Sequence, residues 1–115
     1  MDNREHTRYT ARKPIMVILT LPVSGIYPLI GPLVDISRMG LCFTYLPLQY
    51  DVEIPMTGPC EVVLKYGSRS FSDPIPCKII YETESPTTSS FMVPVRRCGI
   101  QFLAPLPDIA IESIS

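Results

Sequence analysis

Two arginines near the N-terminus have the spacing and the chemistry of a pair that binds phosphate or guanine. Arg4 and Arg8 form the pattern R-x-x-x-R, and Arg12 repeats the same spacing one step later. Guanidinium groups are planar donors that match two acceptors at once, so they suit phosphate oxygens and the O6/N7 edge of guanine. The pattern is common by itself, and the simpler interpretation of this segment is a solvated charged tail.

A second group of polar residues, from Asp35 to Gly40, forms the pattern D-x-S-x-x-G. If residues 33–36 form a strand, Asp35 and Ser37 point to one face, while Ile36 points to the core. A carboxylate there can accept hydrogen bonds from guanine N1–H and N2–H₂. Gly40 permits the left-handed backbone of a tight turn. The simpler interpretation is a hairpin turn in which Asp35 and Ser37 satisfy nearby backbone amides.

The remaining polar side chains assemble no catalytic or metal site in the sequence. His6 is the one histidine, and no carboxylate pair, Ser/His/Asp set or phosphate-cradling glycine loop accompanies it. The four cysteines stand 17 to 21 residues apart without a C-x-x-C pair, so we expect small core hydrophobes rather than zinc ligands. The pair Arg96 and Arg97 could add a phosphate contact from the barrel, but the simpler interpretation, which we favour, is a solvated strand end. We therefore expect no enzyme and no cofactor.

Length and composition restrict the class of protein. The 115 residues suffice for one domain, and the 46% of hydrophobic residues suffice for a packed core. A net charge of −1 argues against a domain that coats DNA or RNA. Because the sequence shows neither a signal peptide nor an apolar stretch long enough to span a bilayer, we expect a cytoplasmic protein without membrane insertion.

The elements that must position the two motifs are short strands, because thirteen prolines leave little room for long helices. Gly31-Pro32 is a turn or kink signal, and Asp108 is the N-cap of a predicted short C-terminal helix. About six strands with regular turn signals favour a small barrel or sandwich. The predicted strands cover residues 15–21, 33–36, 41–46, 60–66, 75–81 and 97–103.

The order and the distance of the two motifs resemble those of the PilZ family, bacterial receptors for the second messenger cyclic di-GMP. The mark of that family is R-x-x-x-R followed further along the chain by [D/N]-x-S-x-x-G. Here Arg8 and Asp35 are 27 positions apart, and both motifs are complete. Residues 98–102 are also similar to the last strand of the family, so the resemblance spans nearly the whole chain.

The resemblance implies an all-β fold, a six-stranded antiparallel β-barrel, in a single domain over residues 1–115. The barrel would cover residues 14–104. A flexible arginine-motif segment over residues 1–13 would wrap over the nucleotide on the barrel surface. Residues 105–115 would form the C-terminal tail or short helix.

Carried over residue by residue, the resemblance makes Arg4 and Arg8 the groups that bind guanine and phosphate. Asp35 and Ser37 would fix guanine and the ligand backbone from the barrel, and Gly40 would shape the turn. Arg12 is an additional candidate, because Arg8 and Arg12 have the same spacing. We favour Arg4 and Arg8, since Arg12 leads directly into the first strand.

The function implied is a non-enzymatic receptor that binds cyclic di-GMP and relays it to an unidentified downstream protein. The alternative is a PilZ-fold protein-interaction module that does not bind nucleotide, and the completeness of both motifs speaks against it. A small OB-like barrel for single-stranded nucleic acid is a third hypothesis, but the chain lacks a basic, aromatic-studded face.

Overall fold

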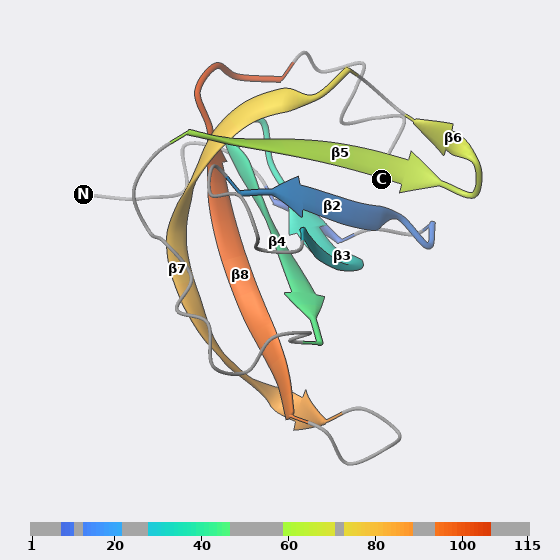
Figure 1. Cartoon of the computed structure of the whole chain (residues 1–115), viewed down its shortest axis with the longest axis vertical. Coiled ribbons are helices and arrows are strands. Elements are labelled where there is room, and N and C mark those ends of the chain that lie inside the picture. The colour runs from blue at the N-terminus through green and yellow to red at the C-terminus, as the bar shows by residue number, and fades with distance from the viewer. Residues whose placement is uncertain are drawn as a thin grey trace.

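The computed structural model contains eight antiparallel strands and no helix within the residues that it describes (Figure 1). These residues are 8–10, 13–21, 28–46, 59–70, 73–88 and 94–106. The strands are β1 (Tyr9–Thr10), β2 (Met16–Thr20), β3 (Leu29–Ile36), β4 (Gly40–Tyr45), β5 (Cys60–Tyr66), β6 (Arg69–Ser70), β7 (Ile75–Thr88) and β8 (Pro94–Phe102).

Six of these strands close into a barrel. The order along the sheet is β3-β2-β5-β7-β8-β4, and a further pairing between β3 and β4 joins its two ends. The short strands β1 and β6 attach to β3 and β5. The predicted all-β, six-stranded antiparallel barrel is confirmed. The predicted C-terminal helix begins at residues 107–108, which lie outside the described part of the chain.

Alternation of apolar and polar residues explains which side chains fill the barrel. In β2, Val17 and Leu19 are buried, whereas Met16 and Thr20 are exposed, because successive side chains of a strand point to opposite faces. Phe43 and Phe102 are the largest fully buried side chains of the core. Around them lie Ile15, Val17, Leu19, Ile36, Leu41, Val62, Leu64, Cys77, Cys98 and Ile100.

Strand β3 is longer than the sequence predicts, since it begins at Leu29 and runs through Gly31-Pro32. The interpretation of Gly31-Pro32 as a turn or kink is wrong. A Cβ atom on Gly31 would lie 1.6 Å from the backbone oxygen of Thr44, so this glycine allows β4 to approach closely. Pro32 is exposed and opposite Met16 of β2.

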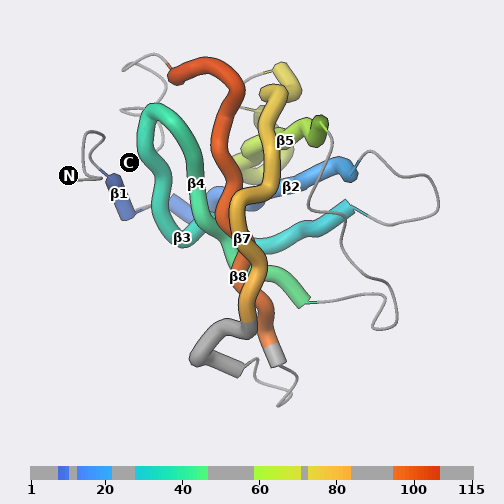
Figure 2. Tube along the Cα trace, turned by 90° about the vertical axis from the view of Figure 1, so that its left-hand side faces the viewer, coloured from blue at the N-terminus to red at the C-terminus, as the bar shows by residue number. Residues whose placement is uncertain are grey.

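Strand β1 lies on the same edge of β3 as β2 does (Figure 2). Tyr9 and Thr10 of β1 pair with Ile36 and Asp35, at the end of β3. This pairing places Arg8 beside that end of β3. The flexibility expected for residues 1–13 stays a prediction.

The four cysteines are buried, and none of them forms a disulfide bond. Cys60, Cys77 and Cys98 lie in the barrel core, as predicted, whereas Cys42 is buried outside that core cluster. Burial raises the pKa of Cys77 to about 12 and also raises the pKa values of the Cys60 and Cys98 thiols. Because the folded pKa exceeds the unfolded one, these thiols leave the free energy of unfolding unchanged below their ordinary pKa. The free energy of unfolding then decreases as the pH rises from there towards about 12.

We therefore expect the native thiols to resist modification by a disulfide reagent at pH 8. Each should react at least about 100-fold more slowly than in the guanidinium-unfolded chain, because all four thiols are buried and burial also disfavours thiolate formation at Cys60, Cys77 and Cys98. The release of thionitrobenzoate over time measures these rates. A rapid burst from the native protein would contradict the burial described here.

Candidate functional site

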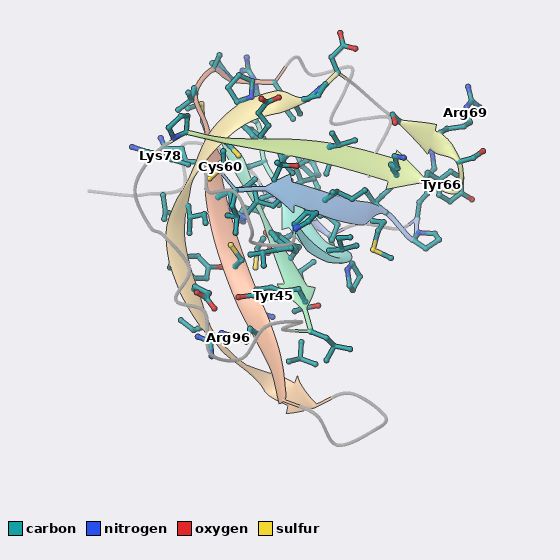
Figure 3. All side chains as sticks on the ribbon, in the orientation of Figure 1. Tyr45, Cys60, Tyr66, Arg69, Lys78 and Arg96 are labelled. Carbon is teal, nitrogen blue, oxygen red and sulfur yellow. The ribbon has the colours of Figure 1, made fainter. Side chains whose placement is uncertain are left out.

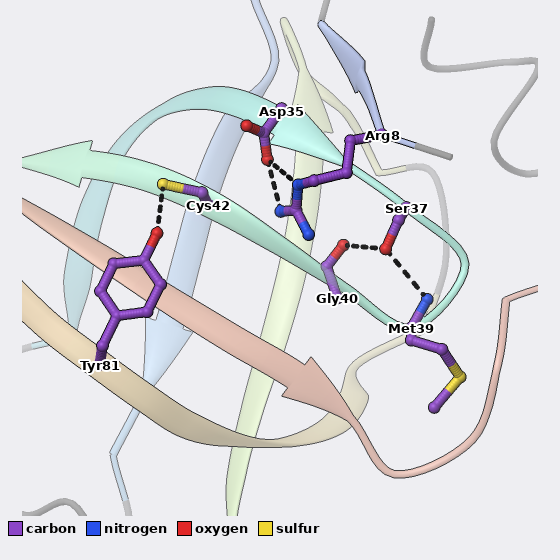
Figure 4. A network of polar contacts seen from close by, with 7 residues as sticks. All are labelled: Arg8, Asp35, Ser37, Met39, Gly40, Cys42 and Tyr81. Atoms are coloured by element: carbon purple, nitrogen blue, oxygen red, sulfur yellow. Dashed lines mark hydrogen bonds and ion pairs between the residues drawn. The ribbon is translucent and has the colours of Figure 1, made fainter. Parts of the chain in front are cut away.

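The two sequence motifs meet in an ion pair between Arg8 and Asp35 on the outside of the barrel (Figure 4). The Nε of Arg8 donates a hydrogen bond to Oδ1 of Asp35 at 2.8 Å, and Nη2 of Arg8 donates to the same oxygen. The pairing of Thr10 with Asp35 brings these residues together across 27 positions of sequence. The Arg8 side chain is 49% exposed and that of Asp35 30%, so solvent reaches the pair.

A bulge in β3 turns Asp35 toward the outside. The β3–β4 register shifts between Leu33 and Asp35, which inserts an extra residue on the β3 side. Leu33 and Ile36 are both buried, and the two residues between them are partly exposed. The carboxylate therefore stands on the outer face of a rigid strand, at the end that β1 covers.

The ion pair shows which chemistry the Asp35 carboxylate can perform. Its Oδ1 accepts two N–H groups from one edge of a planar guanidinium. Guanine offers a similar pair of donors, N1–H and N2–H₂, on its Watson–Crick edge. An exposed ion pair contributes only about 0–1 kcal/mol to stability, so little free energy opposes its replacement by another planar donor.

Ser37 and Gly40 form the tight turn that follows Asp35. The Ser37 backbone N–H donates to the Gly40 carbonyl oxygen at 2.8 Å, and the Ser37 hydroxyl donates to the same oxygen at 3.4 Å. The Met39 N–H donates to the Ser37 hydroxyl at 3.3 Å. Ser37 is buried, so its hydroxyl bonds to nearby backbone groups in the way that the simpler interpretation of this motif describes. Contact of Ser37 with a ligand stays a prediction.

Gly40 is needed for a reason that the sequence did not indicate. The expectation of a left-handed backbone is wrong, because among the described glycines only Gly67 has a positive φ, of 64°. Gly40 is part of β4, and a Cβ atom on it would lie 2.2 Å from the carbonyl oxygen of Ile100. The glycine thus permits β8 to pass close to the turn.

Two further arginine candidates, Arg4 and Arg12, lie outside the described residues. Among the predicted site residues that the structure describes, four lie together at one end of the β3–β4 hairpin: Arg8, Asp35, Ser37 and Gly40.

Arg96 is part of a polar cluster that is separate from the Arg8–Asp35 pair. Its Nε donates to Oε1 of Glu82, and the Tyr45 hydroxyl donates to the same oxygen. Figure 3 shows Tyr45 and Arg96 on the same part of the barrel. Burial, together with the hydrogen bond to Glu82, raises the pKa of the Tyr45 phenol. The interpretation of Arg96 as a solvated strand end is wrong, because Glu82 of the neighbouring strand binds it.

Nothing in the sequence points to Tyr81, whose hydroxyl donates to the sulfur of Cys42 at 3.2 Å. Cys42 is in turn the pairing partner of Asp35. Tyr81 is 46 positions from Asp35, and the two come near each other only through β4 and β8. No local spacing in the sequence signals this proximity.

Within the described residues, no group of three or more His, Cys, Asp or Glu side chains is arranged to hold a metal ion. The same part of the chain has no helix of the length and apolarity that crossing a membrane requires.

Comparison with known proteins identifies similar folds. Six chains of solved structures match. One is the PilZ domain with c-di-GMP of YcgR from Escherichia coli, with a TM-score of 0.69 and 15% sequence identity. The match covers 96% of this chain and 86% of that chain. No protein-family model and no curated protein matches the sequence. At this identity the likeness shows a PilZ-like fold.

Proposed function

We propose that this protein is a non-enzymatic receptor that binds cyclic di-GMP at the Arg8–Asp35 pair. The observation that carries the proposal is this ion pair, in which Arg8 of the first motif and Asp35 of the second meet on the outer face of the barrel. The choice of ligand is supported by the solved structure of similar fold, a PilZ domain with c-di-GMP. The donor and acceptor chemistry of the pair matches a guanine nucleotide.

Binding proceeds by exchange at the Asp35 carboxylate. Guanine N1–H and N2–H₂ take the place of the two Arg8 donors, and the freed guanidinium turns to a phosphate or to the O6/N7 edge of guanine. A second guanidinium comes from Arg4, with Arg12 as the alternative. Ser37 and Gly40 keep the turn behind Asp35 in place, with the Ser37 hydroxyl as a further ligand contact.

The signal passes from the nucleotide to a separate cytoplasmic protein. The segment that holds the arginine motif becomes ordered beyond the existing β1–β3 pairing when the nucleotide binds, and the partner recognises the new surface. A pull-down with and without cyclic di-GMP identifies such a partner, which should be retained only with the nucleotide.

Isothermal titration of the whole chain tests the proposal. Cyclic di-GMP should bind, cyclic di-AMP should bind at least about tenfold more weakly, because adenine has no N1–H or N2–H₂, and a short single-stranded oligonucleotide should give no heat. If cyclic di-GMP gives no heat either, the interaction-module alternative replaces this proposal. If the oligonucleotide binds instead, the protein is a nucleic-acid binder.

We expect Arg8→Ala to weaken binding of cyclic di-GMP at least tenfold, or by about 1.4 kcal/mol, because a charge-assisted bidentate contact to the ligand is lost. Arg69→Ala, which removes an exposed arginine of β6, is the matched control and should leave the affinity unchanged. Titration calorimetry measures both variants.

The same titrations decide the register of the arginine motif. With the pair Arg4 and Arg8, Arg4→Ala weakens binding and Arg12→Ala costs clearly less. A silent Arg4→Ala together with a damaging Arg12→Ala would assign the pair Arg8 and Arg12 instead.

A further inference from the structure

A row of directly paired residues crosses the outer face of the barrel from the proposed site to Tyr81. Asp35 of β3 is opposite Cys42 of β4, and Cys42 is opposite Gly99 of β8. Gly99 is in turn opposite Tyr81 of β7. Paired residues of neighbouring strands point to the same face of a sheet, so these four lie side by side on the outside.

The Tyr81 hydroxyl points to Cys42, which is the pairing partner of Asp35 (Figure 4). A Cβ atom on Gly99 would be 2.1 Å from Cε1 of Tyr81, so the ring occupies the space that the missing side chain leaves. At its far end the Tyr81 hydroxyl donates to the Cys42 sulfur at 3.2 Å. The ring is thus held at two points, on the backbone of β8 and on a side chain of β4.

This arrangement leaves part of the aromatic ring open to solvent. Tyr81 is 38% exposed, whereas Cys42 beside it is 3% exposed and lies outside the inner core cluster. A ring over a cross-strand glycine is a known means of stabilising a sheet, and it accounts for the contact with Gly99. It does not account for the hydrogen bond to Cys42, which holds the hydroxyl end of the ring on the pairing partner of Asp35.

The dimensions suit a purine base. Neighbouring strands are about 4.8 Å apart. Cys42, which accepts the hydrogen bond of the Tyr81 hydroxyl, is one strand away from Asp35. A guanine whose Watson–Crick edge meets Asp35 extends over Cys42 and onto the ring. Burial and the hydrogen bond to Cys42 raise the pKa of the Tyr81 phenol to about 12. A phenol at its ordinary pKa of about 10 is already uncharged at neutral pH, and the raised pKa keeps the ring uncharged at higher pH as well, so it does not repel the phosphates.

We propose that Tyr81 is a stacking platform for a guanine base of cyclic di-GMP, and that Gly99 and Cys42 are its positioning residues. This inference rests on the proposed function, and it adds an aromatic contact from the opposite side of the β4–β8 pair. Base–aromatic stacking is a strong and geometrically simple contact that needs only an exposed ring face.

Affinities of matched variants test the platform. Tyr81→Ala should weaken binding of cyclic di-GMP at least about tenfold, which equals about 1.4 kcal/mol. Tyr81→Phe keeps the ring and loses only the hydrogen bond to Cys42, so it should bind within about threefold of the wild type. Tyr66→Ala is the matched control, because Tyr66 is similarly exposed, at 43%, on β5. It should leave the affinity unchanged.

A second readout follows the ring itself. On saturation with cyclic di-GMP, the ring-proton resonances of Tyr81 should move upfield through the ring current of the stacked base, and those of Tyr66 should not. If Tyr81→Ala does not fold, the ring resonances of the wild type still decide the matter.

The outcomes separate the two proposals. If the wild type does not bind cyclic di-GMP, the proposed function fails. If the wild type binds and Asp35→Ala weakens binding, but Tyr81→Ala binds like the wild type and the ring resonances stay in place, only the platform is overturned.

Discussion

Replacing Asp35 with alanine is expected to weaken binding of cyclic di-GMP by about 100-fold, or about 2.7 kcal/mol. The carboxylate supplies the acceptor for guanine N1–H and N2–H₂, and its loss leaves both donors without a partner. The preference for cyclic di-GMP over cyclic di-AMP should collapse in the same variant. Titration calorimetry with each dinucleotide measures both effects.

The fold should survive this change. The Arg8–Asp35 pair is exposed to solvent, and exposed ion pairs contribute at most about 1 kcal/mol to stability. Glu61→Ala, which removes an exposed carboxylate of β5, is the matched control and should bind like the wild type. Equal affinity of Asp35→Ala and the wild type, with unchanged thermal melting, would remove Asp35 from the site.

The largest effect on stability is expected from Gly40→Ala. The added Cβ atom would lie 2.2 Å from the carbonyl oxygen of Ile100, which is backbone and must move. Because Gly40 pairs with Gln101, such a movement disturbs the β4–β8 ladder of the barrel. We expect a loss of about 3 kcal/mol or more in the free energy of unfolding, measured by urea denaturation.

Gly67→Ala provides a matched comparison for this prediction. Gly67 has a φ of 64° and open space around its Cα, so alanine there meets backbone strain without a clash. Its expected cost is about 1 kcal/mol. If Gly40→Ala costs no more than Gly67→Ala, close approach of β8 is not what requires a glycine at position 40.

Local patterns in the sequence predicted most of the barrel. Residues 60–66, bounded by Gly58-Pro59 and by Gly67, coincide with β5, and residues 15–21 contain all of β2. Alternation and turn residues act within a few positions, so they are visible in a single sequence. The turn or kink predicted at Gly31-Pro32 is not formed, because the glycine instead allows the backbone of Thr44 to approach closely. Only the folded barrel brings Thr44 near.

The candidate site, too, could be predicted only where local sequence patterns indicate it. The residue types of Arg8 and Asp35 indicate guanine chemistry from the sequence alone, but their contact depends on the pairing of β1 with β3. The bulge that turns Asp35 outward has no local signal. The position of Tyr81 beside the site requires two intervening strands, so nothing within its own segment predicts it.

The proposed site is tested most directly by a titration of the isotope-labelled protein with cyclic di-GMP, followed through its backbone amide resonances. The largest shifts are predicted for residues 8–10 and 35–42, with a second group around Gly99 and Tyr81. The amides of β5 and β6, which lie away from the Arg8–Asp35 pair, should stay in place. An unchanged spectrum at saturating nucleotide, or shifts confined to β5 and β6, would contradict binding at this site.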